Sequence, residues 1–363
     1  MSFLQLEKIL KIAGRHEPPD VDKELTQPLE RVMEYRSLGR SGIKISALSY
    51  GAWITFGKQI DDEQARLCLK TAFDAGINFF DNAEVYADGQ AERVMGAAIR
   101  QLGLSRDSFL ISTKLFWGGE GPNQRGLSRK HIIEGLSASL QRLQLDYVDL
   151  LFCHRPDYQT PIEETVRAMN HVIDKGHALY WGTSEWPAEQ IIEAHAVARR
   201  EHLIPPLMEQ PQYHLFHRQR VEVEYARLYD EFGLGLTTWS PLAGGLLTGK
   251  YQDGQPPKDT RATVNGMEWL VDRFVGEEAQ QRIAVVNKLR PVAHELGCSL
   301  AQLAIAWCLC NQRVSTVITG ASRPAQVREN MQALTVAKQL IPTLLKQIDT
   351  TLGSKPEPPK EFR

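Results

Sequence analysis

Four polar side chains follow three successive apolar runs of the chain and together suit proton transfer to a carbonyl oxygen. Asp81 and then Tyr86 follow one run, Lys114 ends the next, and His154 follows the third. Taken alone, each has an ordinary role: an Asp at a strand end caps a turn, a Tyr packs, a Lys is solvated and a His makes hydrogen bonds. Their succession along the chain is what indicates a shared site.

The chemistry expected of this set is donation of a proton by the phenol of Tyr86. A free phenol has a pKa of about 10, so it is a reluctant acid near neutrality. A nearby ammonium favours the phenolate, so Lys114 is expected to lower that pKa. Asp81 would hold Lys114 charged and oriented, and His154 would donate a hydrogen bond to the carbonyl. No metal cluster is evident in the sequence, and a hydride must come from a cofactor.

Alternating strands and helices are needed to bring these residues together. Apolar residues recur at three- and four-residue spacing in Asp61–Ala75 and Ser128–Leu143, which predicts helices, the second of them capped by Ser128. Between such stretches, short runs rich in apolar or β-branched residues predict eight strands: Leu48–Trp53, Asn78–Asp81, Phe109–Lys114, Val148–Cys153, Ala178–Gly182, Leu207–Gln210, Gly235–Trp239 and Ser315–Ile318. Such alternation favours a parallel sheet.

The sheet is either open and doubly wound or closed into a barrel. An open dinucleotide-binding sheet carries G-x-G-x-x-G after its first strand, whereas the first strand here leads into Gly51-Ala-Trp-Ile-Thr-Phe-Gly57. Eight strand–helix units instead of about six also favour the barrel. We therefore predict an α/β fold, a single (β/α)8 TIM barrel, whose catalytic residues gather at the carboxyl ends of its strands.

The barrel is predicted to span residues 34–353. It would begin with a hairpin over residues 35–46 that caps the barrel bottom, and insertions at 115–127 and 250–276 would form long loops over the C-terminal face. Residues 1–33 contain three prolines and predict a flexible arm or a docking segment outside the barrel. Residues 354–363 predict a C-terminal tail.

The composition argues against several classes of protein. A net charge of −2 over 363 residues gives no bulk attraction to nucleic acid or to anionic membranes. The odd number of cysteines, five, argues against a disulfide framework and for a reducing compartment. No apolar stretch reaches the ~18–20 residues of a membrane span, and the acid-rich N-terminus matches neither a secretory signal nor a transit peptide. These features predict a cytoplasmic protein.

The segments that carry the four polar residues resemble the aldo-keto reductases. Asp81-Asn-Ala-Glu-Val-Tyr86, Lys114 and His154 are similar to the catalytic tetrad of that family. The resemblance covers about residues 34–353 and narrows to the branch of voltage-gated potassium channel β-subunits, especially its plant and microbial members. The blocks that look like this branch are Gly51–Gly57, Phe116–Gly119, Arg125–Gly135, Glu163–Met169, Tyr180–Ser184, Thr238–Ala243 and Leu303–Cys308.

This resemblance implies that NADPH binds in an extended pose at the carboxyl ends of the strands. Ser184 and Gln210 would bond the carboxamide, and Trp239 would shape the stacking face of the nicotinamide. The cofactor positions carried over are Trp53, Gln59, Asp81, Ser184, Gln210, Trp239, Ser240, Pro241, Leu242, Ala243, Lys250, Arg261, Gly320, Ser322, Gln326, Glu329 and Asn330.

The phosphates of the cofactor would meet positive charge and a helix N-terminus. Lys250 and Arg261 would face the pyrophosphate or the 2′-phosphate, and Arg323 is a further candidate for the latter. The segment Gly320–Asn330 combines a close-approach glycine with a helix N-terminus, where anions bind well.

Three positions depart from the animal members of this branch. His154 stands where they have Asn, and Gly244 replaces a cysteine, so thiol-based redox sensing is not expected there. Glu185 stands where they have an Arg that touches the cofactor, which puts Glu185 in doubt as a phosphate contact.

Two functions follow from the resemblance. One is NADPH-dependent reduction of aldehydes and ketones to alcohols, with Tyr86 as the proton donor. The other is a homotetrameric cytoplasmic β-subunit of a voltage-gated potassium channel, with the cofactor as redox sensor. The intact tetrad with His154 favours the enzyme. Trp117, Trp186 and Phe216 either line the substrate pocket or pack in the core.

Overall fold

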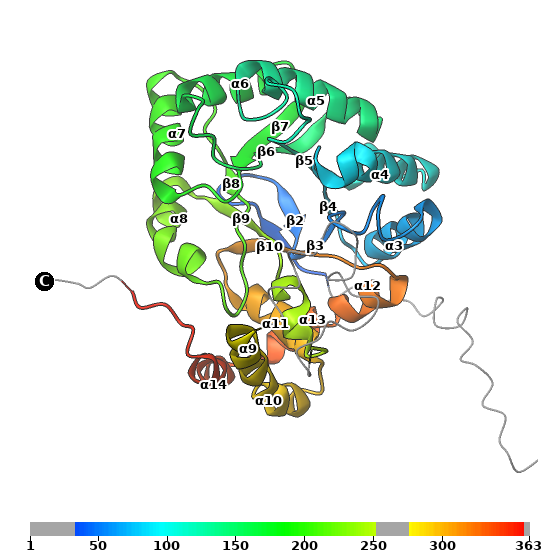
Figure 1. Ribbon diagram of the computed structural model, residues 1–363, viewed down its shortest axis with the longest axis vertical. Coiled ribbons are helices and arrows are strands. Elements are labelled where there is room, and N and C mark those ends of the chain that lie inside the picture. The colour runs from blue at the N-terminus through cyan, green and yellow to red at the C-terminus, as the bar shows by residue number, and fades with distance from the viewer. Residues whose placement is uncertain (1–32, 252–275, 359–363) are drawn as a thin grey trace, which may run out of the picture. The chain divides into compact units, whose positions relative to one another are not determined.

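In the computed structural model, which describes residues 33–251 and 276–358, eight parallel strands form a closed barrel (Figure 1). Their order around the barrel is β10-β3-β4-β5-β6-β7-β8-β9. The strands are β3 Leu48–Gly51, β4 Phe79–Asp81, β5 Leu110–Leu115, β6 Val148–Cys153, β7 Ala178–Thr183, β8 Met208–Glu209, β9 Gly235–Thr238 and β10 Val314–Thr319. The predicted α/β barrel is confirmed, and every strand ends within two residues of its predicted position.

Helices cover the outside of the barrel (Figure 1). The two helices predicted from periodicity are present as α3 and α5, and the hydroxyl of Ser128 caps α5 by accepting a hydrogen bond from the backbone N–H of His131 at 3.2 Å. The α-helices are α3 Asp62–Asp74, α4 Gln90–Gln101, α5 Arg129–Leu143, α6 Ile162–Asp174, α7 Ala188–Arg200, α8 Ala226–Phe232, α9 Glu277–Asn287, α10 Arg290–Glu295, α11 Leu300–Cys310, α12 Pro324–Met331, α13 Ala333–Gln339 and α14 Pro342–Leu352.

The predicted hairpin closes the amino-terminal end of the barrel. It consists of β1 (Tyr35–Ser37) and β2 (Lys44–Ser46), paired antiparallel. Leu38 and Ile45 pack with the cluster of apolar side chains inside the barrel. The backbone N–H of Arg40 donates to the carbonyl of Gly233, just before β9, at 2.9 Å. The barrel therefore opens toward solvent at the carboxyl ends of its strands.

Every second side chain of a strand points into the barrel, and this alternation carries polar residues to the open end. On β4, Phe79 and Asp81 lie on the inner face. On β6, Leu150 and Phe152 lie on the inner face, and His154, directly after the strand, continues that alternation. The apolar members fill the middle of the barrel. Asp81 ends β4 and His154 follows the end of β6, so both lie above that apolar layer.

Parts of the predicted organisation lie outside the described residues. Most of the predicted extension (1–33), most of the insertion at 250–276 and the end of the tail fall there, so these boundaries stay predictions. The insertion at 115–127 is described and folds back on itself, with the N–H of Gly118 donating to the carbonyl of Gln124 at 2.9 Å. Within the described ranges, no single helix is both long and apolar enough to cross a membrane; one bent pair, Glu277–Glu295 with Leu300–Cys310, meets that test jointly.

Candidate active site

Asp81 is the buried acceptor at the centre of the polar cluster. Its Oδ2 accepts a hydrogen bond from Lys114 Nζ at 2.7 Å, and the same two groups form an ion pair. Its Oδ1 accepts from Ser112 Oγ at 2.8 Å and from Gln210 Nε2 at 3.0 Å. Residues from β4, from β5 and from the end of β8 thus meet at one carboxylate. Its negative charge compensates the positive charge of the buried Lys114 ammonium.

Lys114 connects this carboxylate to the phenol of Tyr86. Its side chain is fully buried, and Nζ donates to Tyr86 Oη at 3.0 Å and to the carbonyl oxygen of Asn82 at 2.9 Å. Tyr86 follows β4 in a tight turn, in which Ala87 and Asp88 adopt positive φ values of 50° and 54°. With its three donors directed at Asp81, Asn82 and Tyr86, the ammonium holds the phenol in a fixed place.

The charge balance of the pair differs from the prediction. Desolvation raises the pKa of Tyr86 and outweighs the charge of Lys114, which acts to lower it. Burial acts to lower the pKa of Lys114, but Asp81 and Tyr86 together raise it. Lys114 therefore acts in the expected direction, but the pKa of Tyr86 is raised overall, because the same burial that brings the groups together disfavours a phenolate. Tyr86 is held as a neutral donor.

His154 lies beside Tyr86 and is neutral. The two rings meet edge to face with centroids 5.8 Å apart, and Trp117 contacts the imidazole with centroids 5.0 Å apart. Burial, followed by the positive charges of Lys114 and Arg155, lowers the pKa of His154 well below its ordinary value. A neutral imidazole keeps one N–H to donate.

The loop that carries Trp117 is anchored beneath the site. The carboxylate of Glu84 accepts from the backbone N–H of Phe116 at 2.7 Å and interacts with His131 Nε2 at 3.0 Å. Glu84 lies between Asp81 and Tyr86 in the sequence. The same turn that presents Tyr86 therefore fixes the loop after β5, and with it the wall of the pocket.

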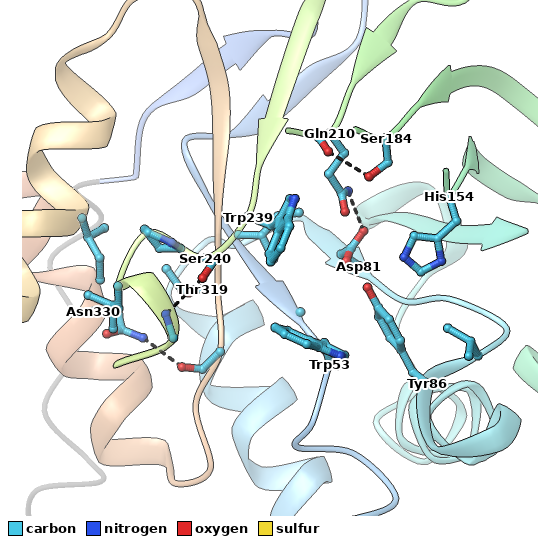
Figure 2. Close-up of a pocket in the computed structure, with 18 of the residues that line it drawn as sticks. Trp53, Asp81, Tyr86, His154, Ser184, Gln210, Trp239, Ser240, Thr319 and Asn330 are labelled. Atoms are coloured by element: carbon cyan, nitrogen blue, oxygen red, sulfur yellow. Dashed lines mark hydrogen bonds between the residues drawn. The ribbon is translucent and has the colours of Figure 1, made fainter. Parts of the chain in front are cut away.

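A cavity of about 570 Å³ runs from these residues across the open end of the barrel. Figure 2 shows Asp81, Tyr86 and His154 on one side and Ser240, Thr319 and Asn330 on the other, with Trp53 and Trp239 between them. The lining residues are Gly51, Trp53, Asp81, Val85, Tyr86, Trp117, His154, Arg155, Ser184, Gln210, Trp239, Ser240, Pro241, Leu242, Gly244, Ile305, Ile318, Thr319, Gly320 and Asn330.

Ten of the residues that were predicted to bind the cofactor line this cavity. The members that line it are Trp53, Asp81, Ser184, Gln210, Trp239, Ser240, Pro241, Leu242, Gly320 and Asn330. The members that do not line it are Gln59, Ala243, Lys250, Ser322, Gln326 and Glu329, and Arg261 lies outside the described residues.

Two hydrogen-bonded pairs involve α12: Ser322 with Gln326, which do not line the cavity, and Gly320 with Asn330, which do. Gln326 Oε1 accepts from the backbone N–H of Ser322 at 2.8 Å and from its hydroxyl at 3.0 Å. Asn330 Nδ2 donates to the carbonyl of Gly320 at 3.5 Å. Arg323, the cap residue of α12, is exposed. In the described ranges, no group of three or more His, Cys, Asp or Glu side chains has the arrangement of a metal site.

Comparison with known proteins agrees with this geometry. The model of the aldo/keto reductase family matches residues 47–351. The chain belongs to the aldo/keto reductase family. Two plant proteins, from Arabidopsis thaliana and from Oryza sativa subsp. japonica, are each 56% identical to it over 331 residues, which is 91% of this chain and 100% of each relative. Both are named "Probable voltage-gated potassium channel subunit beta", so the predicted branch is confirmed.

Within this family fold, Glu185 has a role that the sequence did not indicate. Its Oε1 accepts from Trp239 Nε1 at 3.0 Å and from the backbone N–H of Gln212 at 2.5 Å, and its Oε2 pairs with Arg220 at 2.9 Å. The carboxylate of Glu185 therefore accepts a hydrogen bond from the indole of Trp239, which lines the cavity. Trp239 in turn meets Trp53 edge to face, with centroids 5.9 Å apart.

Arg155 is a second cavity residue whose role was not predicted from the sequence. Its Nη1 donates to the carbonyl of His154 at 2.5 Å and lies 3.4 Å from Ser184 Oγ. Its position directly after His154 at a strand end was the available signal. Of the three aromatic candidates, Trp117 lines the cavity, whereas Trp186 is buried in the core and Phe216 packs against it.

Proposed function

We propose that this protein is an NADPH-dependent reductase that converts aldehydes and ketones to alcohols. The observation that carries this proposal is the chain of hydrogen bonds from Asp81 through Lys114 to Tyr86, which ends at a phenol on the cavity wall beside His154. Family membership supports a nicotinamide cofactor.

The residues of the cavity fit such a cofactor. Ser184 and Gln210 lie at the end that holds the tetrad, where they would bind the carboxamide, and the indoles of Trp53 and Trp239 offer faces and edges to a planar ring. Ser240 and Asn330 lie at the other end (Figure 2), where polar side chains would meet the phosphates. The cofactor positions predicted from the resemblance remain part of this proposal, Lys250 and Arg261 included.

In this proposal Tyr86 supplies the proton and His154 orients the substrate. A bound nicotinamide would supply a hydride to the carbonyl carbon. Tyr86 donates its proton to the carbonyl oxygen, and the ammonium of Lys114 stabilises the phenolate left behind. The neutral imidazole of His154 donates a hydrogen bond to the same oxygen. Asp81 keeps Lys114 charged throughout.

Substitution of Tyr86 by Phe tests the proton donor. We expect Tyr86→Phe to lower kcat for aldehyde reduction by at least about 100-fold, in the range that general acid catalysis supplies. The affinity for NADPH should change little, because the ring remains. The measurement is loss of NADPH absorbance over a panel of sugar, aromatic, dicarbonyl and ketone substrates.

The matched control is Tyr158→Phe, which removes a hydroxyl from a side chain that is 77% exposed. This variant should retain wild-type rates. Unchanged activity in Tyr86→Phe would rule out the proposed donor. A preference for NADH over NADPH in the same assays would contradict the proposed cofactor.

A second function, regulation of a potassium channel, is favoured by the names of the two plant relatives. We propose that the chain also forms a homotetramer in the cytoplasm that binds the intracellular part of a voltage-gated channel, with the cofactor state as its input. Co-purification of the tagged protein with a channel subunit from its native host tests this. Absence of any channel from cross-linked material would count against it.

A further inference from the structure

Arg155 brings a positive charge to the tetrad end of the cavity without a carboxylate to balance it. Among residues 33–251 and 276–358, no Asp or Glu lies within ion-pair distance of its guanidinium. Asp157, the nearest acid in the sequence, is bonded instead to Thr160 at 2.7 Å and to the backbone N–H of Leu127 at 2.7 Å. The guanidinium of Arg155 instead hydrogen bonds to neutral oxygens, the carbonyl of His154 and the hydroxyl of Ser184.

The other charges of the site cancel. The ammonium of Lys114 is paired with Asp81, and His154 is neutral because burial lowers its pKa well below the usual range. Arg155 therefore leaves this end of the cavity with an excess of one positive charge. In a site with low exposure to water, such a charge attracts an anion more strongly than it would on an open surface.

The guanidinium also lies against an aromatic wall. Its central carbon is 5.5 Å from the ring of Trp117, and the same indole contacts His154. Trp117 comes from the loop after β5 and Arg155 from the end of β6. Between them the two residues offer a planar set of N–H donors beside an apolar surface, which is an arrangement that suits a carboxylate on an aromatic or aliphatic body.

The phosphates of a cofactor do not account for this charge. Arg155 is bonded to His154 and lies next to Ser184, and both residues are at the opposite side of the cavity from Ser240 and Asn330 (Figure 2). The group that Arg155 serves must therefore belong to a molecule bound at the tetrad end.

We propose that Arg155 and Trp117 form a subsite for a carboxylate on the substrate, so that the preferred substrates are small carbonyl compounds that carry an acid group. This inference rests on the proposed reductase function for its catalytic consequence, although the binding of the anion does not depend on turnover. Bidentate contact with the guanidinium would place the acid group, while the carbonyl lies toward Tyr86.

A matched pair of aldehydes tests the subsite: 4-carboxybenzaldehyde and its neutral methyl ester. For the wild type we expect kcat/KM to be at least tenfold higher for the acid. Arg155→Gln should lower the acid-to-ester ratio of kcat/KM by about 10- to 100-fold, mainly through KM, the size expected for a charge-assisted hydrogen bond. Arg155→Lys should restore part of the ratio.

The control variant is Arg227→Gln, which removes a charge from a side chain of α8 that is 83% exposed. It should leave the ratio at the wild-type value. An equal loss for both aldehydes in Arg155→Gln, or a loss that follows a raised KM for NADPH, would assign Arg155 to the cofactor or to His154 and overturn the subsite.

A binding measurement separates this inference from the proposed function. Titration of the full-length protein with 4-(hydroxymethyl)benzoate, in the presence and absence of NADP⁺, should give a Kd at least tenfold lower than that of its methyl ester. This preference should disappear in Arg155→Gln. Equal affinity for acid and ester overturns the subsite, whereas preferential binding without reduction of either aldehyde supports the subsite and counts against the reductase.

Discussion

At the scale of single residues, Glu185 shows how a charged side chain serves an aromatic one. The residue lies two positions after the end of β7, next to Ser184, and adopts a positive φ of 58°, a conformation that L side chains seldom adopt. In it, the carboxylate reaches both Arg220 and the indole N–H of Trp239. The backbone conformation after β7 thus fixes the side chain of Trp239, which follows β9.

Replacement of Glu185 tests this arrangement. Glu185→Ala frees the indole N–H, so we expect Trp239 to lose its fixed orientation and the Kd for NADPH to rise about 5- to 20-fold, with little change in kcat. Glu185→Gln keeps an acceptor and should recover most of the affinity. Cofactor titration followed by tryptophan fluorescence measures both, and identical Kd values in all three proteins would contradict the assignment.

The protonation states of the tetrad predict a flat pH profile. The pKa of His154 is lowered and that of Tyr86 is raised, so neither group titrates between pH 6 and pH 8. The imidazole stays neutral above its lowered pKa, and the phenol stays protonated below its raised one. The rate of aldehyde reduction at saturating NADPH should therefore vary less than about threefold over this window. An inflection near pH 6.5 would show that His154 takes up a proton.

At the scale of elements, the pattern of the sequence sufficed to place the strands, because each is an apolar run bounded by polar residues. The first strand, which was predicted to reach Trp53, shows where this pattern fails to give the strand end. It ends at Gly51, since Ile54 takes a positive φ of 70° and the chain turns outward. The grouping of Asp81, Tyr86, Lys114 and His154 at one end of the barrel could be predicted from their positions at and after strand ends, whereas their catalytic roles belong to the proposed function.

The roles of Arg155 and Glu185 could not be predicted in that way. Arg155 directly follows His154, the first residue after β6, and Glu185 directly follows Ser184, the first residue after β7. What they do depends on which way the side chain points after the strand, and that is decided by partners far away in the sequence, such as Trp239 for Glu185. The raised pKa of Tyr86 was missed for a related reason, because burial is a property of the whole fold.

Strand β8 contains a carboxyl group that makes stability depend on pH. Glu209 is fully buried and hydrogen bonded with Thr183 of β7. Burial raises its pKa from 4.5 to about 8. The folded protein keeps this proton up to about pH 8, whereas the unfolded chain releases it above pH 4.5. The contribution of Glu209 to stability is therefore complete below pH 4.5 and is lost as the pH rises through that window.

The variant Glu209→Gln has no proton to lose. Between pH 4.5 and pH 8, its free energy of unfolding relative to the wild type should rise by about 2–4 kcal/mol, because folding raises the pKa of Glu209 from 4.5 to about 8. Urea unfolding at several pH values measures this difference. Substitution of the half-exposed Glu231 by Gln serves as the control. Parallel pH dependences for Glu209→Gln and the wild type would show that Glu209 titrates normally.

At the scale of the whole molecule, the proposed homotetramer predicts a particle of four times the chain mass of 41.0 kDa. Light scattering coupled to gel filtration measures this mass directly, and it should hold with and without NADP⁺ if assembly does not depend on the cofactor. A mass equal to one chain at micromolar concentration would argue against the channel-subunit proposal and leave the reductase proposal intact.

Closure of the barrel also has a consequence for synthesis of the chain. The first barrel strand, β3, pairs with the last, β10, through Leu48 with Val317 and Tyr50 with Thr319. Arg36 in the hairpin also donates to the carbonyl of Val314 at 2.8 Å. At about 5–20 residues per second, β3 leaves the ribosome many seconds before its partner exists. During that time its open edge can pair with other chains, so the nascent protein is exposed to aggregation until β10 emerges.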